Sequence, residues 1–114
     1  MLFSMYEQKY LCILDLLSNP PGRECRGLEL VLESEKKYNA GESKTVLKRG
    51  AIYVQLTNLE NGGCVSSRLD PDNPPDTRLF RITEDGRRYR AEIRQKENGN
   101  AGWRIPGFGG PQPA

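Results

Sequence analysis

The feature that most constrains this fold is a series of proline and glycine breaks that divides the chain into short segments. Pro20-Pro21-Gly22, Gly41 and Gly62-Gly63 each follow an apolar segment. Proline cannot continue a helical hydrogen-bond ladder, and glycine favours the residue just past a helix end. Apolar residues recur at helical spacing before these breaks, and strand-like segments follow the last one. We therefore expect three helices, then a β-hairpin and a final helix.

The expected elements can be placed by residue number. Helices are predicted over 5–17, 24–38, 49–61 and 84–96, and strands over 64–69 and 78–83. In the third helix, Ile52, Leu56 and Leu59 form one apolar stripe, and Thr83 is the expected N-cap of the fourth. Four residues of the second helix are expected to face the core: Leu28, Leu30, Val31 and Leu32.

This order predicts a mainly α fold with a small β-hairpin, arranged as a winged helix-turn-helix. The predicted domain spans 1–97, and 98–114 is a Gly/Pro-rich C-terminal tail. A third helix with one apolar stripe leaves its other face for solvent or a partner, and a helix fits the major groove of B-DNA.

Composition narrows the functional classes. A chain of 114 residues with no histidine lacks the commonest general base and metal ligand, so we expect neither an enzyme nor a metal or cofactor site. Cys12, Cys25 and Cys64 are too widely spaced for a zinc motif and are consistent with a reducing cytoplasm. Arginines flank Cys25, so redox sensing there is a minor alternative. No apolar run approaches the roughly 18 residues of a membrane span.

Charge is unevenly distributed along the chain. Residues 1–43 carry five basic and seven acidic groups, whereas residues 44–114 carry twelve basic and eight acidic groups. The C-terminal part is therefore the expected polyanion-binding part.

Several motifs resemble one known family. The stretch 47–65, with Gly50, Tyr53, Leu56, Leu59 and Glu60, is similar to the recognition-helix segment of the PadR-like winged-helix transcriptional regulators. The segments 81–86, 11–17 and 27–30 resemble that family's Thr-Glu-x-Gly strand end, apolar first helix and second helix. The resemblance covers roughly residues 8–94. It implies a homodimeric regulator of operator DNA, with a small-molecule effector that the sequence does not identify.

The sequence departs from the family pattern in two places that affect binding. Lys48-Arg49 replace a common Ser-Pro, which removes a helix cap and adds two cations. The hairpin tip, 70–76, carries three carboxylates, which repel phosphate.

Candidate DNA contacts follow from side-chain chemistry. Gln55 and Asn58 can pair with adenine, Lys48 and Arg49 can contact guanine or phosphate, and the resemblance favours a place for Tyr53 at the DNA surface. The remaining candidates for phosphate contact are Lys44, Thr45, Arg68 and Arg78. The alternative for each is an ordinary solvated position or, for Tyr53, core packing.

A dimer interface is expected where the first and fourth helices present aromatic and apolar side chains. Its candidates are Phe3, Tyr6, Tyr10, Tyr89 and Ile93. The alternative is that Tyr89 and Ile93 close the core of the single chain. The arginine run at 87–94 is expected to be a solvated face, and a basic flank on DNA is the alternative.

A second functional hypothesis is a winged-helix module that docks on another protein and does not bind DNA. The low net charge of +2 and the acidic tip favour it. Lys48, Arg49, Gln55 and Asn58 together on an exposed face favour DNA.

We predict that the acidic tip stays off DNA. Replacing Asp72 and Asp76 with lysine should tighten binding to duplex DNA at fixed salt, because two repulsive charges become attractive. Titration of a labelled duplex measures the change. Weaker binding would instead assign the tip a specific contact.

Overall fold

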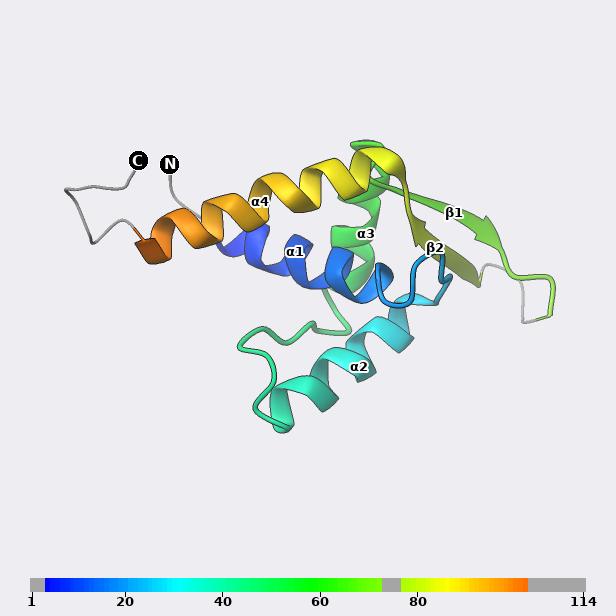
Figure 1. Cartoon of the computed structure of the whole chain (residues 1–114). Coiled ribbons are helices and arrows are strands. Elements are labelled where there is room, and N and C mark those ends of the chain that lie inside the picture. Colours follow the sequence, from blue (N-terminus) through cyan, green and yellow to red (C-terminus); the bar gives the residue numbers. More distant parts are fainter. Residues whose placement is uncertain (1–3, 73–76, 103–114) are drawn as a thin grey trace.

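The computed structural model describes residues 4–72 and 77–102, and its elements follow the predicted order. They are α1 (Met5–Leu17), α2 (Gly27–Asn39), α3 (Ile52–Asn61), β1 (Val65–Leu69), β2 (Arg78–Ile82) and α4 (Glu84–Gly102). In Figure 1, α4 and α2 lie on opposite sides of α1, and the hairpin extends from the end where α4 begins. The mainly helical fold with a two-stranded hairpin is confirmed.

Side-chain caps and glycines define several helix ends. Ser4 Oγ accepts the Glu7 N–H at 3.1 Å while Glu7 Oε1 accepts the Ser4 N–H at 3.1 Å, which is a reciprocal capping box. Thr83 Oγ1 accepts the Gly86 N–H at 3.0 Å, so the predicted N-cap of α4 is confirmed. Gly41 and Gly63, just beyond α2 and α3, adopt positive φ.

The hairpin gains a third partner that the sequence did not predict. β1 and β2 pair antiparallel, with Ser67 opposite Phe80. Phe80 in turn donates its N–H to the Cys25 carbonyl at 2.8 Å and accepts the Cys25 N–H at 3.1 Å. The prediction that the second helix begins near residue 24 was wrong, because this pairing keeps Cys25 extended and α2 starts at Gly27.

Two further helix boundaries differ from the prediction. α3 begins at Ile52 rather than residue 49, and its first turn has no side-chain cap. α4 continues to Gly102 rather than ending at residue 96. Near the predicted end, Arg94 and Lys96 make ion pairs with Asp15 and Glu7 of α1. The expected tail therefore begins inside a helix, and residues 103–114 lie outside the described part.

One hydrophobic core joins the helices to the hairpin. Its wholly buried members include Ile13, Leu14, Leu17, Leu30, Val31, Leu47, Ile52, Leu56 and Ile93. From β2, Phe80 and Ile82 are buried in this core.

The prediction that all four apolar residues of the α2 run face the core was wrong. Leu28 and Leu32 are 42% and 46% exposed, while Leu30 and Val31 are buried. Four apolar residues within five positions span more than the one face that a helix can bury.

A buried hydroxyl holds the loop that leads into α3. Ser34 Oγ donates to the Val31 carbonyl at 2.8 Å and accepts the Leu47 N–H at 2.9 Å. Leu47 is itself wholly buried. The backbone entering α3 is therefore anchored to α2 by a satisfied hydrogen bond and by apolar burial.

We predict that Gly86→Ala strongly destabilises the fold. A Cβ at Gly86 would collide with the Cys64 carbonyl oxygen and the Ile82 side chain, and the carbonyl is fixed because it accepts the Thr83 N–H. The expected loss is about 1–3 kcal/mol in urea unfolding. Gly50→Ala, where a Cβ would meet nothing within 4 Å, is the matched control and should not lower stability. Equal stability of the two variants would contradict the close packing of α4 on Cys64.

Candidate nucleic-acid interface

The two sides of α3 differ in burial and polarity. Ile52, Leu56 and Leu59 are 1–3% exposed and pack toward α1, α2 and β1. The opposite side exposes four residues, none of which carries a charge: Val54, Thr57, Asn58 and Asn61. Burial of the apolar stripe thus turns an uncharged outer face of α3 toward solvent.

Exposed cations without an acidic partner flank that face. Most basic side chains of the chain form salt bridges. Within residues 4–72 and 77–102, six exposed ones have no carboxylate within 4 Å: Lys36, Lys44, Lys48, Arg49, Arg78 and Arg81. Lys44, Lys48 and Arg49 precede α3, and Arg78 and Arg81 lie on β2. These five side chains, called the free cations below, are available to bind an anion.

The free cations of β2 donate hydrogen bonds to serine hydroxyl groups of β1. Arg78 donates to Ser67 Oγ at 3.1 Å, and Arg81 donates to Ser66 Oγ at 3.3 Å. Ser67 in turn donates to Glu60 at 2.8 Å. These neutral acceptors orient the two guanidinium groups without neutralising them.

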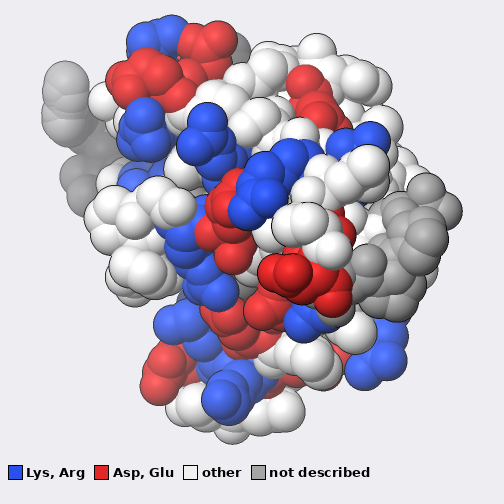
Figure 2. All heavy atoms as spheres, turned by 90° about the vertical axis from the view of Figure 1, so that its right-hand side faces the viewer, with Lys and Arg blue, Asp and Glu red and all other residues white. Residues whose placement is uncertain are grey.

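Arg68 differs from the other predicted phosphate contacts. Its guanidinium donates to both carboxylate oxygens of Glu24, at 2.8 and 2.9 Å, and this bidentate bond lowers the pKa of Glu24. The charge of Arg68 is compensated, so its evident contribution is to hold β1 against the segment between α1 and α2. Figure 2 shows basic and acidic side chains interleaved over the end of the molecule that carries the hairpin.

The arginine run of α4 is also paired. Arg87 binds Glu84, Arg88 binds Asp85, and both Arg90 and Arg94 bind Asp15 of α1 at 2.6 and 2.5 Å. This pairing favours the solvated, structural interpretation of the run over a basic flank.

The predicted base-contacting residues are not equally accessible. Tyr53 is 56% exposed, and its ring covers Gly27, where a Cβ would come within 2.9 Å of the ring. Asn58 is exposed and donates one amide hydrogen to the Tyr10 hydroxyl at 3.2 Å. Gln55 is only partly exposed, and its Oε1 is buried without a hydrogen-bond partner. Among the phosphate candidates, Thr45 is half-buried and its backbone bonds Ser43.

The predicted dimer residues separate into exposed and buried positions. Tyr6 is 72% exposed beside Met5 at 73%, whereas Tyr10 and Tyr89 pack against the core. Ile93 is wholly buried within the single chain, which favours the alternative that it closes the chain's own core. Phe3 lies outside the described residues.

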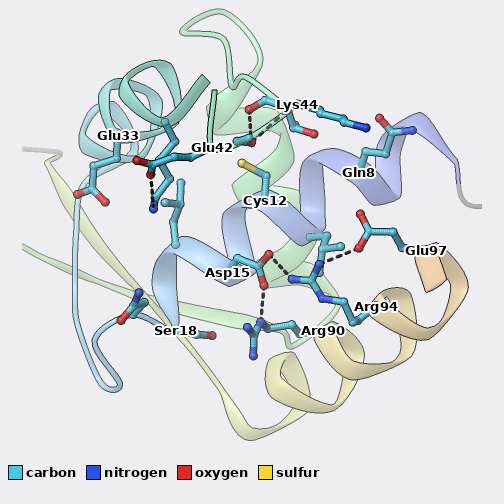
Figure 3. A pocket seen from close by; sticks show the side chains of 16 residues that line it. Gln8, Cys12, Asp15, Ser18, Glu33, Glu42, Lys44, Arg90, Arg94 and Glu97 are labelled. Atoms are coloured by element: carbon cyan, nitrogen blue, oxygen red, sulfur yellow. Dashed lines mark hydrogen bonds and ion pairs between the residues drawn. The ribbon is translucent and has the colours of Figure 1, made fainter. Parts of the chain in front are cut away.

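A polar pocket of about 930 Å³ lies between α1, α2, α4 and the loop 42–45 (Figure 3). Its charged lining groups are mostly paired, since Asp15 binds Arg90 and Arg94, and Lys37 lies 3.8 Å from Glu42. Burial raises the pKa of the Cys12 thiol, which also lines the pocket, to about 11. The thiol form therefore predominates at neutral pH, and a thiol is a weaker nucleophile than a thiolate.

The Cys25 environment does not support redox sensing. Burial raises the pKa of its thiol to about 11, even though Arg23 is nearby. Arg23 is committed to Glu33 through two hydrogen bonds of 2.9 and 2.6 Å, and Arg26 bonds Glu29. A protonated, buried thiol reacts slowly with oxidants.

The described residues contain no group of three or more Cys, Asp or Glu side chains that could hold a metal ion. Nor does any helix in the described part of the chain combine the length and apolarity that a membrane crossing requires.

Comparison with known proteins assigns a family to this arrangement. The model of the transcriptional regulator PadR-like family matches residues 13–92, which span all six elements in part or in full. A search of curated protein sequences finds no significant match.

Solved structures share the fold at low sequence identity. A protein from Thermoplasma acidophilum described as a transcriptional regulator superposes with a TM-score of 0.66 at 22% identity, covering 85% of each chain. A transcriptional regulator from Clostridium thermocellum gives 0.64 at 21% identity, covering 80% of this chain and 83% of the other. A PadR-like transcription factor from Bacteroides fragilis gives 0.62 at 18% identity, covering 84% and 85%.

We predict that Gln55→Met stabilises the fold by about 1 kcal/mol, because it removes a buried oxygen without a partner and keeps the side-chain volume. Urea unfolding measures the change. Asn61→Met, at an exposed position of the same helix, is the control and should leave stability within about 0.5 kcal/mol. A destabilised Gln55→Met would show that the amide has a partner that matters.

Proposed function

The chain belongs to the PadR-like family of transcriptional regulators, and we propose that it binds duplex DNA sequence-specifically as a homodimer, with α3 in the major groove. The observation that carries this proposal is the uncharged, exposed outer face of α3 between two groups of free cations. Protein–DNA interfaces combine two kinds of contact: cations contact the phosphates and position the protein, and contacts in the groove select the base sequence.

The entry to α3 is suited to a phosphate group. Lys48 and Arg49 lie in the turn before the helix. The Ile52 N–H donates to the Lys48 carbonyl at 2.9 Å, and no side chain caps the first turn of the helix, which begins at Ile52. Helix N-termini attract anions through their N–H groups and the helix dipole. Lys44 is a further exposed cation of the segment before α3 and lines the pocket between α1, α2 and α4.

The hairpin would approach the DNA backbone through β2. Arg78 and Arg81 supply free charge, whereas Arg68 is neutralised by Glu24 and the exposed Asp72 near the tip repels phosphate. We therefore propose that Arg78 and Arg81, rather than the tip or Arg68, make the hairpin's phosphate contacts.

The homodimer is proposed from the exposed aromatic and apolar start of α1. Met5 and Tyr6 are more than 70% exposed, and nothing in the described chain covers them. A symmetric pair of α3 helices in successive major grooves would recognise half-sites about 10 base pairs apart.

The alternative, a module that docks on another protein, is favoured by the paired charge of Arg68 and by the acidic tip. A protein-docking module does not require free cations beside an uncharged helix face. Retention on random duplex DNA at low salt separates the two functions, because only the DNA-binding regulator is retained and then eluted by salt.

We predict that the double variant Lys48→Ala/Arg49→Ala raises the Kd for duplex DNA roughly tenfold or more. It should also reduce the slope of log K against log salt by about 2, since two phosphate contacts are lost. Fluorescence anisotropy over a salt series measures both quantities.

Arg87→Ala/Arg88→Ala is the matched control for this experiment. It removes the same charge from cations already paired with Glu84 and Asp85, so it should change affinity much less. Equal losses in the two double variants would mean that net charge alone drives binding. Absence of duplex retention by the unaltered protein would favour the docking module.

A further inference from the structure

Two β-branched side chains occupy the outermost part of α3 without any structural need. Val54 is 63% exposed, and Thr57 is exposed one turn further along. Residues three apart are neighbours on a helix surface, so their methyl groups form one small apolar patch. Valine and threonine are weaker helix formers than alanine, lysine or glutamate, and at these exposed positions burial does not offset the unfavourable helix propensity. Neither local propensity nor packing explains their presence.

The surroundings of this patch suit a partner that carries charge only at its edges. The one charged residue of α3 is Glu60, which lies to one side and accepts a hydrogen bond from Ser67 of β1. The free cations lie in the segment before the helix and on β2, and α3 itself carries no basic residue. A duplex has the complementary distribution, with phosphates along both rims of the groove and uncharged base edges on its floor.

The floor of the major groove offers one apolar group, the C5-methyl of thymine. The isopropyl group of Val54 and the methyl group of Thr57 can contact it, while the Asn58 and Asn61 amides can hydrogen-bond neighbouring base edges. We propose that Val54 and Thr57 are specificity-determining residues that select thymine methyl groups in each half-site, an inference that rests on the DNA binding proposed above. The preferred sites therefore contain thymine opposite the middle of α3.

Exposed apolar residues elsewhere provide the comparison for this inference. Leu28 and Leu32 are also exposed, on the outer side of α2, but they lie on a face that includes Glu35 and Lys36. Leu32→Ala removes more apolar surface than Val54→Ala and does so away from α3. It is the matched control.

The experiment begins with selection of bound sequences from a random duplex pool by the full chain. Each thymine of the selected site is then replaced in turn by deoxyuridine, which lacks only the C5-methyl group, and the Kd of each duplex is measured. For the unaltered protein we expect a loss of about threefold to fivefold at one or two positions in each half-site, the effect of one buried methyl group.

The variants assign that loss to particular side chains. For Val54→Ala, the Kd values of the thymine and deoxyuridine duplexes should be equal at one of the sensitive positions. Thr57→Ser keeps the hydroxyl but loses the methyl group, and its two Kd values should be equal at the same or the adjacent position. Leu32→Ala should keep the full sensitivity. Both helix variants replace exposed side chains, and circular dichroism confirms that they are folded.

The outcomes separate this inference from the proposed function. Duplex binding without sensitivity to deoxyuridine, or with sensitivity that survives both Val54→Ala and Thr57→Ser, overturns the role of the two residues and leaves DNA binding intact. Failure of the unaltered protein to bind any duplex at low salt overturns both.

Discussion

Burial of one side of α3 is the constraint on which the rest of the structure depends. Ile52, Leu56 and Leu59 enter a core built from every other element, and this fixes the rotation of the helix about its axis. The Ser34 hydroxyl and the wholly buried Leu47 fix where the helix begins. Together these contacts determine which residues of α3 face solvent, so the composition of that face is a consequence of packing.

Pairing of charges within the molecule leaves a candidate binding surface that the net charge of +2 does not indicate. Arginines on α4 and β1 are bound by acidic side chains and hold elements together, as with Asp15 between Arg90 and Arg94. Such partly exposed pairs contribute little stability individually. Their larger effect is on where positive charge remains uncompensated: among the described residues, the exposed cations without an acidic partner lie in the segment before α3, on β2 and, with Lys36, on α2.

The sequence predicted the fold well because its signals were local. The apolar stripe of α3, the Thr83 cap and the glycines at 41 and 63 depend on residues a few positions apart, and the structure has each where the pattern placed it. The error at the start of α2 arose from a contact distant in sequence. Phe80 pairs with Cys25 across 55 positions, which keeps Cys25 extended and moves the start of α2 to Gly27.

The candidate site was predictable as a helix face but not residue by residue. Helical spacing placed Asn58 and Gln55 together, yet only the packing shows that the Gln55 oxygen points inward. Likewise, the charge of Arg68 is visible in the sequence, but its neutralisation by Glu24 is not. A chemical signal for Val54 and Thr57 was available, since both stand opposite the apolar stripe in the helical repeat.

The two backbone hydrogen bonds between Phe80 and Cys25 have a mechanical consequence. They join β2 to Cys25, the residue just before the N-cap of α2, and the Glu24–Arg68 ion pair links β1 to the same segment. A displacement of the hairpin therefore also displaces the start of α2. The first residue of α2, Gly27, is in contact with the ring of Tyr53 in α3. The hairpin and α3 are thus coupled through these contacts. Such coupling reduces the conformational entropy lost when both elements bind one rigid partner.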